Sequence, residues 1–565
     1  MCQPYPPQAR AAEPITLVLE DGRTCVAPSG TPAGNLPGAD GTRDGLPYLA
    51  ARVNHDVVSL SYPLEYDARV EFLTFADAHG WRVYQRSLSF LTAVALRRTF
   101  PRAQFRVQHS LGQGLYWSFR DNAHEGMDAD KLRRLDGALR ELVARDLPIE
   151  RRKLSYMDAL ARFTEDGEDD KRDLLSCRNP PHVVLHVCDG ASDLAHGPLA
   201  GRTGLLDRFQ LVEHERGFVL NLPSRTAPFQ VEELERQPHL FHIYQEHKEW
   251  GRILGVDTVG RLNQIIATGE VEAFMRTAEA LHEQKIGRIA EQIMARRGQL
   301  RVLLIAGPSS AGKTTFAKRL TTHLTVHGLR PVTLGTDDYF LGPEQTPRDA
   351  EGKLDFEHVE AVDLPAFNRD LAALVEGEEI EAISFNFQTK ARELTGKRLR
   401  LEADQLLIVE GIHGLNPRLS LQVPAERKFS IYVSALTQLN LDRHNRISTT
   451  DNRLMRRMVR DHRYRGHSAL ATLRSWPSVR RGEERWIFPF QSGADATFNS
   501  ALDYELAVLK PKVEPLLMQI KPDQPEYAEA RRLAQFLYNF SAVDERGVPR
   551  TSILREYIGG SAFRY

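Results

Sequence analysis

The chain has 565 residues, of which 74 are Lys or Arg and 75 are Asp or Glu. Because a single hydrophobic core rarely serves so long a chain, we expect several domains. The balanced charge excludes a global electrostatic field that would hold the protein on nucleic acid or on an anionic membrane, so any basic site must be local.

Cysteine content and hydropathy indicate a cytoplasmic protein. Cys2, Cys25, Cys177 and Cys188 show no C-x-x-C spacing and are too few to cross-link a chain of this size. No apolar run approaches the roughly eighteen residues of a membrane span, and the first residues lack a signal-peptide core. We therefore expect free thiols, no membrane partner and a cytoplasmic location.

In chain order, the first expected unit is a small β-rich module over residues 1–75. Short apolar pieces there, such as ITLVLEDG and RVEFLTF, are separated by Gly, Pro and Asp, which is typical of strands and turns. Helix-like and strand-like segments then mix over 76–227, which predicts an α+β domain. Apolar residues at helical spacing predict a helical connector over 228–299.

Residues 300–521 predict an α/β domain. Apolar strand-like segments such as RVLLIAG, DQLLIVEG and KFSIYVS alternate with helix-like ones. This alternation predicts a parallel sheet with helices on both faces. Residues 522–565 are then left as a helical extension at the C-terminus.

The α/β segment opens with a phosphate-binding motif, since Gly307, Gly312, Lys313 and Thr314 fit G-x-x-x-x-G-K-[ST]. The backbone N–H groups of such a loop face phosphate oxygens, the lysine reaches the β- and γ-phosphates, and the hydroxyl supplies an oxygen to Mg²⁺. A chance match is the alternative, and the flanking strand and helix make it rare. We assign ATP binding to Gly307, Ser309, Ser310, Ala311, Gly312, Lys313, Thr314 and Thr315.

Two later strands deliver carboxylates to the edge of the sheet where ligands bind in such folds. Asp337 and Asp338 follow the strand PVTLGT, and Glu410 follows the strand LLIV. An isolated acid in such a place is more often a turn or helix-capping residue. Beside a phosphate loop, however, it can hold Mg²⁺ or accept a proton from an attacking hydroxyl.

The segment RLMRRMVRDHRYRGH places Arg456, Arg460 and Arg463 on one face of a helix, with Arg457 and Arg465 nearby. The ordinary interpretation of a basic helix is a solvated surface. In a phosphoryl-transfer enzyme the alternative is a lid whose guanidinium groups meet the charge on the transferred phosphoryl.

From about residue 301 to 521, these motifs resemble the uridine kinase and phosphoribulokinase family. The segments TDDYF, LDFEHVEAVD, FNFQTKAR, LLIVEGIHGL and RDHRYRGH resemble successive segments of that family, in the same order. The resemblance implies a kinase that uses ATP and Mg²⁺, with Asp337 as the general base. It assigns catalytic roles to Lys313, Asp337, Arg460 and Arg465, and metal binding to Thr314 and Glu410. It assigns substrate binding to Asp337, Phe340, Glu357, Lys390 and Arg392.

Three departures from the family pattern bear on the acceptor. Glu357 stands in place of a ribose-binding Asp, Lys390 in place of a base-reading His, and Phe340 in place of a substrate-contacting Tyr. The implied acceptor is a nucleoside similar to uridine or cytidine. A small polyol or a sugar phosphate is the alternative, because Lys390 suits an anionic substrate.

The first half resembles the N-terminal regions of threonyl-tRNA synthetase, a TGS module followed by an editing-type domain. Residues 193–223 resemble its D-L-C-x-G-P-H region, and HSLGQG, residues 109–114, resembles its H-x-x-x-H helix start. Of the four polar site positions only His109 is kept, which leaves too few ligands for a zinc site. The other three positions hold Gln113, Ala195 and Leu199.

The order of these pieces resembles a group of nucleoside kinase-like proteins that carry a synthetase-like N-terminus. A rival hypothesis is an ATP-gated RNA-associated factor, which would need a contiguous basic surface with exposed aromatic residues. The acidic segments DARVEF, NAHEGMDAD and FTEDGEDD argue against this partner. The sequence does not specify the oligomeric state or the role of the first half.

Overall fold

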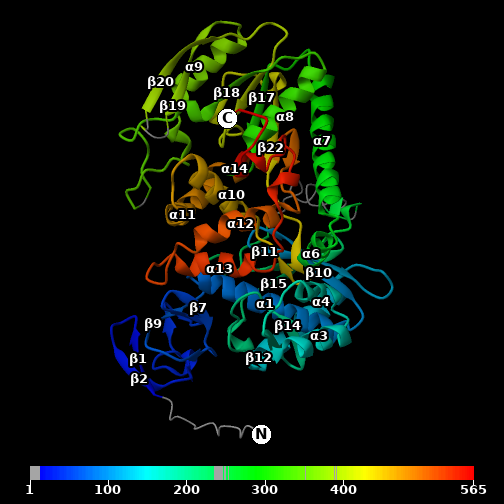
Figure 1. Ribbon diagram of the computed structural model, residues 1–565, viewed down its shortest axis with the longest axis vertical. Helices are drawn as coiled ribbons and strands as arrows, with labels where there is room; N and C mark the ends of the chain where they lie inside the picture. The colour runs from blue at the N-terminus through cyan, green and yellow to red at the C-terminus, as the bar shows by residue number, and fades with distance from the viewer. Residues whose placement is uncertain are drawn as a thin grey trace, which may run out of the picture.

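The structure is a computed structural model that describes residues 13–234, 246, 248, 250–251, 253–349, 351–386, 389 and 391–564. Figure 1 shows an elongated molecule with the N-terminal sheets at one end and the sheet of the α/β segment at the other. Helices from the last third of the chain lie between them. Within the described ranges, no helix combines the length and apolar character needed to cross a membrane.

The first unit is a five-stranded sheet with strand order β2-β1-β9-β6-β7. Its strands are β1 (Pro14–Leu19), β2 (Thr24–Pro28), β6 (Ala50–Val53), β7 (Asp56–Ser59) and β9 (Ala68–Leu73). Alternate residues of β1 are buried, as the alternating sequence predicts. Strands β1 and β9 pair in parallel, whereas the other pairs are antiparallel.

The second unit packs two antiparallel sheets around a long helix, α1 (Ala78–Thr99), most of whose residues are buried. One sheet contains β10 (Gln104–Leu111), β11 (Gly114–Arg120), β16 (Gly217–Asn221) and β15 (Gln210–His214). The other contains β12 (Glu150–Ser155), β13 (His182–Cys188) and β14 (Ala191–Leu194). Helices α2 (Ala129–Ala144), α3 (Tyr156–Glu165) and α4 (Asp169–Ser176) complete the unit.

The helix start predicted at HSLGQG is wrong. His109 lies inside strand β10, and the chain turns at Gly112 into strand β11. Gly112 has a φ of 54°, a conformation that glycine adopts without strain and that suits a tight hairpin turn. The second half of β10 alternates buried and partly exposed residues, as expected for a strand with one face in the core.

The α/β segment forms a parallel sheet with strand order β18-β21-β17-β22-β25, which confirms the predicted fold class. The strands are β17 (Val302–Ala306), β18 (Val332–Gly335), β21 (Leu407–Glu410), β22 (Lys428–Ser434) and β25 (Ala496–Asn499). Leu303 and Ile305 face a core shared with α7 (Val271–Ala295), α8 (Lys313–Val326), α10 (Thr449–Tyr464) and α12 (Glu505–Leu517). Val302 and Leu304 face the opposite core, which contains α9 (Leu364–Val375).

The remaining elements lie at the edges of this segment. A hairpin of β19 (Ile380–Asn386) and β20 (Ala391–Leu399) stands beside the sheet. Helix α6 (Val259–Ala267) precedes α7, α11 (Ala469–Trp486) follows α10, and α13 (Tyr527–Leu537) and α14 (Arg555–Ile558) end the chain. The C-terminus thereby returns to the α/β sheet (Figure 1). The domain boundaries given above stay predictions.

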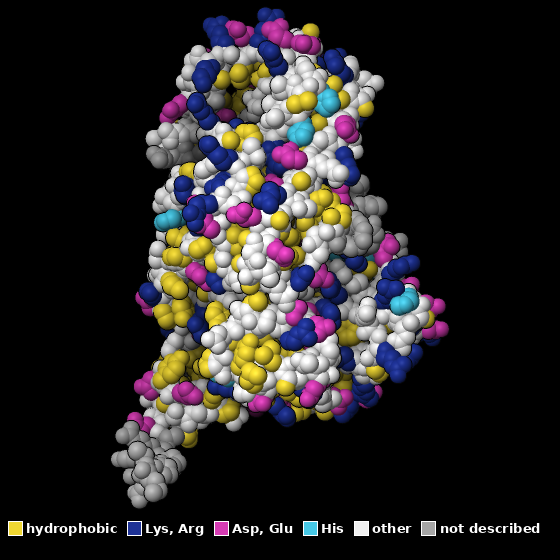
Figure 2. All heavy atoms as spheres, turned by 45° about the vertical axis from the view of Figure 1, so that its right-hand side comes forward, with side chains coloured by type: hydrophobic (Ala, Val, Ile, Leu, Met, Phe, Trp, Pro, Cys, Tyr) yellow, Lys and Arg dark blue, Asp and Glu magenta, His cyan; other side chains and the backbone are white. Residues whose placement is uncertain are grey.

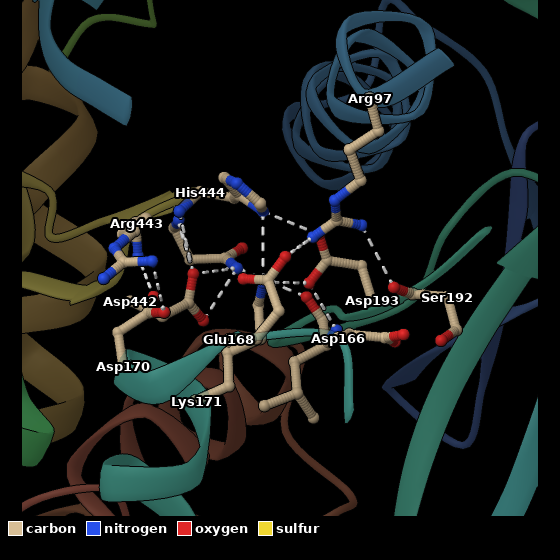
Figure 3. Close-up of polar contacts among 12 residues, drawn as sticks. Arg97, Asp166, Glu168, Asp170, Lys171, Ser192, Asp193, Asp442, Arg443 and His444 are labelled. Atoms are coloured by element: carbon tan, nitrogen blue, oxygen red, sulfur yellow. Dashed lines mark hydrogen bonds and ion pairs between the residues drawn. The ribbon is translucent and has the colours of Figure 1, made fainter. Parts of the chain in front are cut away.

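A small hairpin of the α/β segment inserts into the second unit (Figure 3). It consists of β23 (Asn440–Asp442) and β24 (Asn445–Arg446). His444 Nδ1 lies 2.7 Å from Asp193 Oδ2, and its ring stacks on Phe105 with centroids 5.1 Å apart. Asn440 Nδ2 donates to the carbonyl oxygen of Val107 at 2.7 Å. The two halves of the chain are therefore joined by buried polar bonds as well as by apolar packing.

Lys171 lies at the centre of this junction with a fully buried side chain. Its Nζ lies 2.8 Å from Glu168 and 2.9 Å from Asp193, and Arg97 also pairs with both acids. Burial alone would lower the pKa of Lys171, but the two carboxylates outweigh burial and raise it. The lysine therefore stays charged and neutralises two acids at the interface.

Candidate active site

The phosphate loop connects the end of β17 to the start of α8, and close packing explains its glycines. A Cβ on Gly307 would lie 2.0 Å from the carbonyl oxygen of Val433 on the next strand. Gly312 has a φ of 82°, which favours glycine. It directly precedes Lys313, the first residue of α8. The N-terminus of α8 thus opens at the carboxyl edge of the sheet, where its N–H groups suit an anion.

Buried side chains from distant segments hold the carbonyl groups of the loop. Arg453 Nε donates to Ser309 O at 2.9 Å, and Ser500 Oγ donates to Ala311 O at 2.6 Å. Glu483 accepts from the N–H of Ser309 at 3.1 Å and also pairs with Arg453. The loop is therefore preorganised by its own protein neighbours.

The arginine-rich helix α10 is largely turned inward. Arg456 is fully buried against Glu505 and Ser500, and its Nη1 lies 3.4 Å from Ser310 O. Arg457 donates to Ser309 Oγ at 2.7 Å and lies 3.8 Å from Glu357. A solvated basic face is therefore the wrong interpretation for these two residues.

The two predicted lid arginines share one acid. Arg460 lies 2.9 Å and Arg465 lies 3.7 Å from Asp461 Oδ1. Arg460 is mostly buried, with 15% of its side chain exposed, and Arg465 has 34% exposed. The neighbouring charge of Arg460 and burial lower the pKa of Arg465 to about 10, against the opposing charges of Asp461 and Asp337.

Three carboxylates and Lys313 interact electrostatically at the edge of the sheet. Thr314 Oγ1 donates to Glu410 Oε2 at 3.2 Å. The pKa of Glu410 is raised to about 7, mainly by burial and also by the charge of Asp337, while Lys313 opposes the shift. Burial also raises the pKa of Glu357, against the opposing effects of Arg457 and Lys313. Asp337, Glu357 and Glu410 therefore form an acidic cluster beside the phosphate loop.

The other acid after β18, Asp338, bonds to the neighbouring β19. Asp338 accepts from the N–H of Phe385 on β19 at 3.4 Å, and burial raises its pKa. Of the two adjacent acids, Asp337 is thus the one whose charge acts on Glu357 and Glu410.

The predicted substrate residues occupy different environments. Glu357 is packed against helix α11, where a Cβ on Gly482 would lie 2.2 Å from the Cβ of Glu357. Phe340 is buried, with its ring centroid 5.8 Å from that of Phe385. Arg392 on β20 pairs with Asp363 at 2.8 Å. Lys390 lies outside the described residues. The roles of all four stay predictions.

Sequence patterns missed Arg453, Glu483, Gly482 and the residues near the C-terminus that contact the loop, and they named Arg457 without its contact to Ser309. The run of arginines was the sequence signal for α10, but it did not show which of these arginines are buried and which are exposed. The partners of these residues lie tens to hundreds of positions away in the chain, so no local spacing could identify them.

Comparison with known proteins separates the two halves. Residues 302–507 match the family model described as "Phosphoribulokinase / Uridine kinase family". This segment is a phosphoribulokinase/uridine kinase family domain. Its boundaries include the phosphate loop, the acidic cluster and the arginines of α10.

Two solved kinase structures match 38% of the chain each. The putative fructose transport system kinase from Silicibacter sp. TM1040 is 17% identical, with 98% of it covered and a TM-score of 0.29. A possible uridine kinase from Bacillus stearothermophilus is 18% identical, with 98% of it covered and a TM-score of 0.26.

The N-terminal region is similar to threonine–tRNA ligases. The ligase of Geobacter sp. (strain M21) is 31% identical over 197 residues, which is 35% of this chain and 31% of the ligase. That of Desulforamulus reducens is 31% identical over 201 residues, with the same two shares. The chain therefore spans about a third of the length of these curated relatives.

Two of the four synthetase-like positions, His109 and Leu199, are buried. His109 is buried against the ring of Tyr116 at 5.1 Å, and burial holds its pKa well below the usual range. Leu199 is part of the hydrophobic core. In the described part of the chain, no three His, Cys, Asp or Glu side chains are grouped as a metal site. A cavity of about 1430 Å³ is lined by both His109 and His444.

Proposed function

We propose that the protein is a kinase that transfers the γ-phosphoryl group of ATP to a hydroxyl of a nucleoside-like small molecule. One observation carries the proposal. The carboxyl edge of the family domain brings the phosphate loop together with Asp337, Glu357 and Glu410. Phosphoryl transfer requires these groups, namely a phosphate cradle, acids that hold Mg²⁺ and a base for the acceptor hydroxyl.

Thr314 and Glu410 are the residues that would hold Mg²⁺. Their hydroxyl and carboxylate oxygens are hard ligands, and they already lie 3.2 Å apart. When bound, the cation neutralises charge on the phosphates. Such a site needs only one or two protein carboxylates, because Mg²⁺ keeps water and phosphate ligands.

Asp337 is the proposed base for the acceptor hydroxyl, and Lys313 would bind the β- and γ-phosphates. Arg460 and Arg465 would meet the charge of the transferred group from the end of α10. Glu357 is suited to recognise acceptor hydroxyls. Its Oε2 is buried and, among the described residues, has no hydrogen-bond partner, so a donor from the acceptor would satisfy it.

A nucleoside is the leading acceptor, and a small polyol or a sugar phosphate is the second candidate. An RNA-associated function receives less support. On the face drawn in Figure 2, Lys and Arg side chains are interspersed with Asp and Glu. A protein that binds RNA generally carries a continuous basic surface.

The test is ATP consumption by the full chain against nucleosides, sugars, sugar phosphates and RNA. Lys313→Ala should abolish transfer while leaving the fold intact, because the side chain acts on phosphate charge. Lys318→Ala, on the same helix, is the matched control. Near wild-type turnover by Lys313→Ala would contradict the kinase proposal. ATP hydrolysis that only RNA stimulates would favour the RNA-associated alternative.

A further inference from the structure

Helix α14 lies directly on the phosphate loop, although it is outside the matched segment of residues 302–507. Glu556 Oε2 accepts a hydrogen bond from the N–H of Thr315 at 3.2 Å and from Thr315 Oγ1 at 2.7 Å. Thr315 belongs to the first turn of α8. A carboxylate from the end of the chain therefore occupies a donor of the phosphate loop.

Neighbours of Glu556 contact the same loop. Tyr557 Oη donates to Ser310 O at 3.0 Å. Ile553 packs on Gly312 so closely that a Cβ there would lie 2.5 Å from Ile553 Cγ2. Residues 553–557 thus contact the loop at three positions, which directs Glu556 toward the start of α8.

The donors that Glu556 occupies are those that bind phosphate in loops of this kind. The first N–H groups of a helix have no partner within the helix, and in this motif they face the phosphates of the nucleotide. A carboxylate oxygen and a phosphate oxygen are both anionic acceptors. They would compete for the N–H of Thr315, and their charges would repel each other.

The side chain of Glu556 can move, whereas the segment that carries it is fixed. Ile553, Leu554, Tyr557 and Ile558 are at most 1% exposed and belong to the core of the α/β domain. Arg555 fixes the segment further through bonds to Val548 O at 2.6 Å and Glu545 O at 2.8 Å. Glu556 itself is partly exposed. A rotation about its side-chain bonds would release Thr315 without unfolding the helix.

We propose that Glu556 is a built-in competitor of the donor nucleotide, whose carboxylate holds Thr315 until the phosphates of ATP displace it. This proposal rests on the proposed kinase function. Glu556 would then control the affinity for ATP, although it lies outside the matched segment of residues 302–507. The protein would thereby bind ATP less tightly than its loop alone allows.

The experiment measures the Kd of ATP by calorimetry on the full chain. Glu556→Gln keeps the shape but removes the charge, and it should lower this Kd about tenfold or more, as expected when a charged hydrogen bond no longer competes. Thr315→Ala keeps the N–H but removes the hydroxyl that holds Glu556, so it should tighten binding to a smaller extent. The combined variant should bind no more tightly than Glu556→Gln alone.

The matched control is Asp544→Asn, which removes the same charge from an exposed acid that pairs with the neighbouring Arg546. It should leave the Kd unchanged. If the wild type binds ATP and Glu556→Gln binds equally well or more weakly, the competitor proposal is overturned while the kinase proposal stands. If neither protein binds ATP, the kinase proposal fails, and the competitor proposal fails with it.

Discussion

Glu410 should release a proton when Mg·ATP binds. Its pKa of about 7 in the free protein results first from burial and then from the charges of Asp337 and Glu556, which Lys313 and Thr314 only partly offset. A bound cation next to the carboxylate favours the charged form. Binding should therefore convert the protonated fraction of Glu410 into carboxylate.

The size of the effect follows from the pKa. About 0.9 of Glu410 is protonated at pH 6, about 0.5 at pH 7 and about 0.1 at pH 8. Affinity for Mg·ATP should thus rise with pH and level off above about pH 8. The stability of the free protein changes in the opposite direction. Because the folded pKa is raised, the contribution of Glu410 is present at low pH and is lost as pH rises through about 7.

Calorimetry in buffers of small and large ionisation enthalpy counts the released protons directly. Glu410→Gln corrects for the protonation of ATP itself, because it meets the same ligand without a titrating group at this position. Glu357→Gln is the second control, since burial also raises the pKa of Glu357. Binding heats that are identical in all buffers, or proton release that persists unchanged in Glu410→Gln, would refute the reasoning.

Four further variants test the site and the junction. Asp337→Asn should reduce kcat about a hundredfold or more. Glu357→Gln should mainly raise the KM of the acceptor, about tenfold. Steady-state kinetics that show the reverse pattern would disprove both roles. Gly482→Ala would force Glu357 to move, because the added Cβ would lie 2.2 Å from its Cβ, so the acceptor KM should rise while the Kd of ATP stays unchanged. Lys171→Met should destabilise the junction by about 3–5 kcal/mol, since it leaves buried acids without their lysine; wild-type hydrogen exchange at β14 and β23 would contradict this.

The sequence predicted the parts of the site that depend on local pattern. The motif ending in Lys313 and Thr314 is contiguous, and Asp337 and Glu410 follow apolar strands that pair in parallel. The pairing of those strands brings their ends to one edge. The chemistry at that edge therefore follows from the order of the elements alone.

The parts that could not be predicted depend on contacts between distant segments. Arg453 and Glu483 lie on different helices and form a buried pair, and nothing in either helix distinguishes them from surface charges. The contact between Glu556 and Thr315 spans 241 positions. HSLGQG resembles a helix start, but His109 lies in strand β10, which pairs with β11 and not with residues four positions away.

The junction explains how the N-terminal units are mechanically linked to the phosphate loop. The hairpin of β23 and β24, which is bonded to Asp193 and Val107 in the second unit, leads directly into α10 at Thr449. Arg457, which bonds to Ser309 in the loop, lies eight residues further along the helix, a rise of about 12 Å. Since a helix of two turns transmits displacement with little bending, a shift of the second unit against the hairpin would move the arginines that hold the loop. The second unit and the phosphate loop are therefore connected through one hairpin and the first turns of α10.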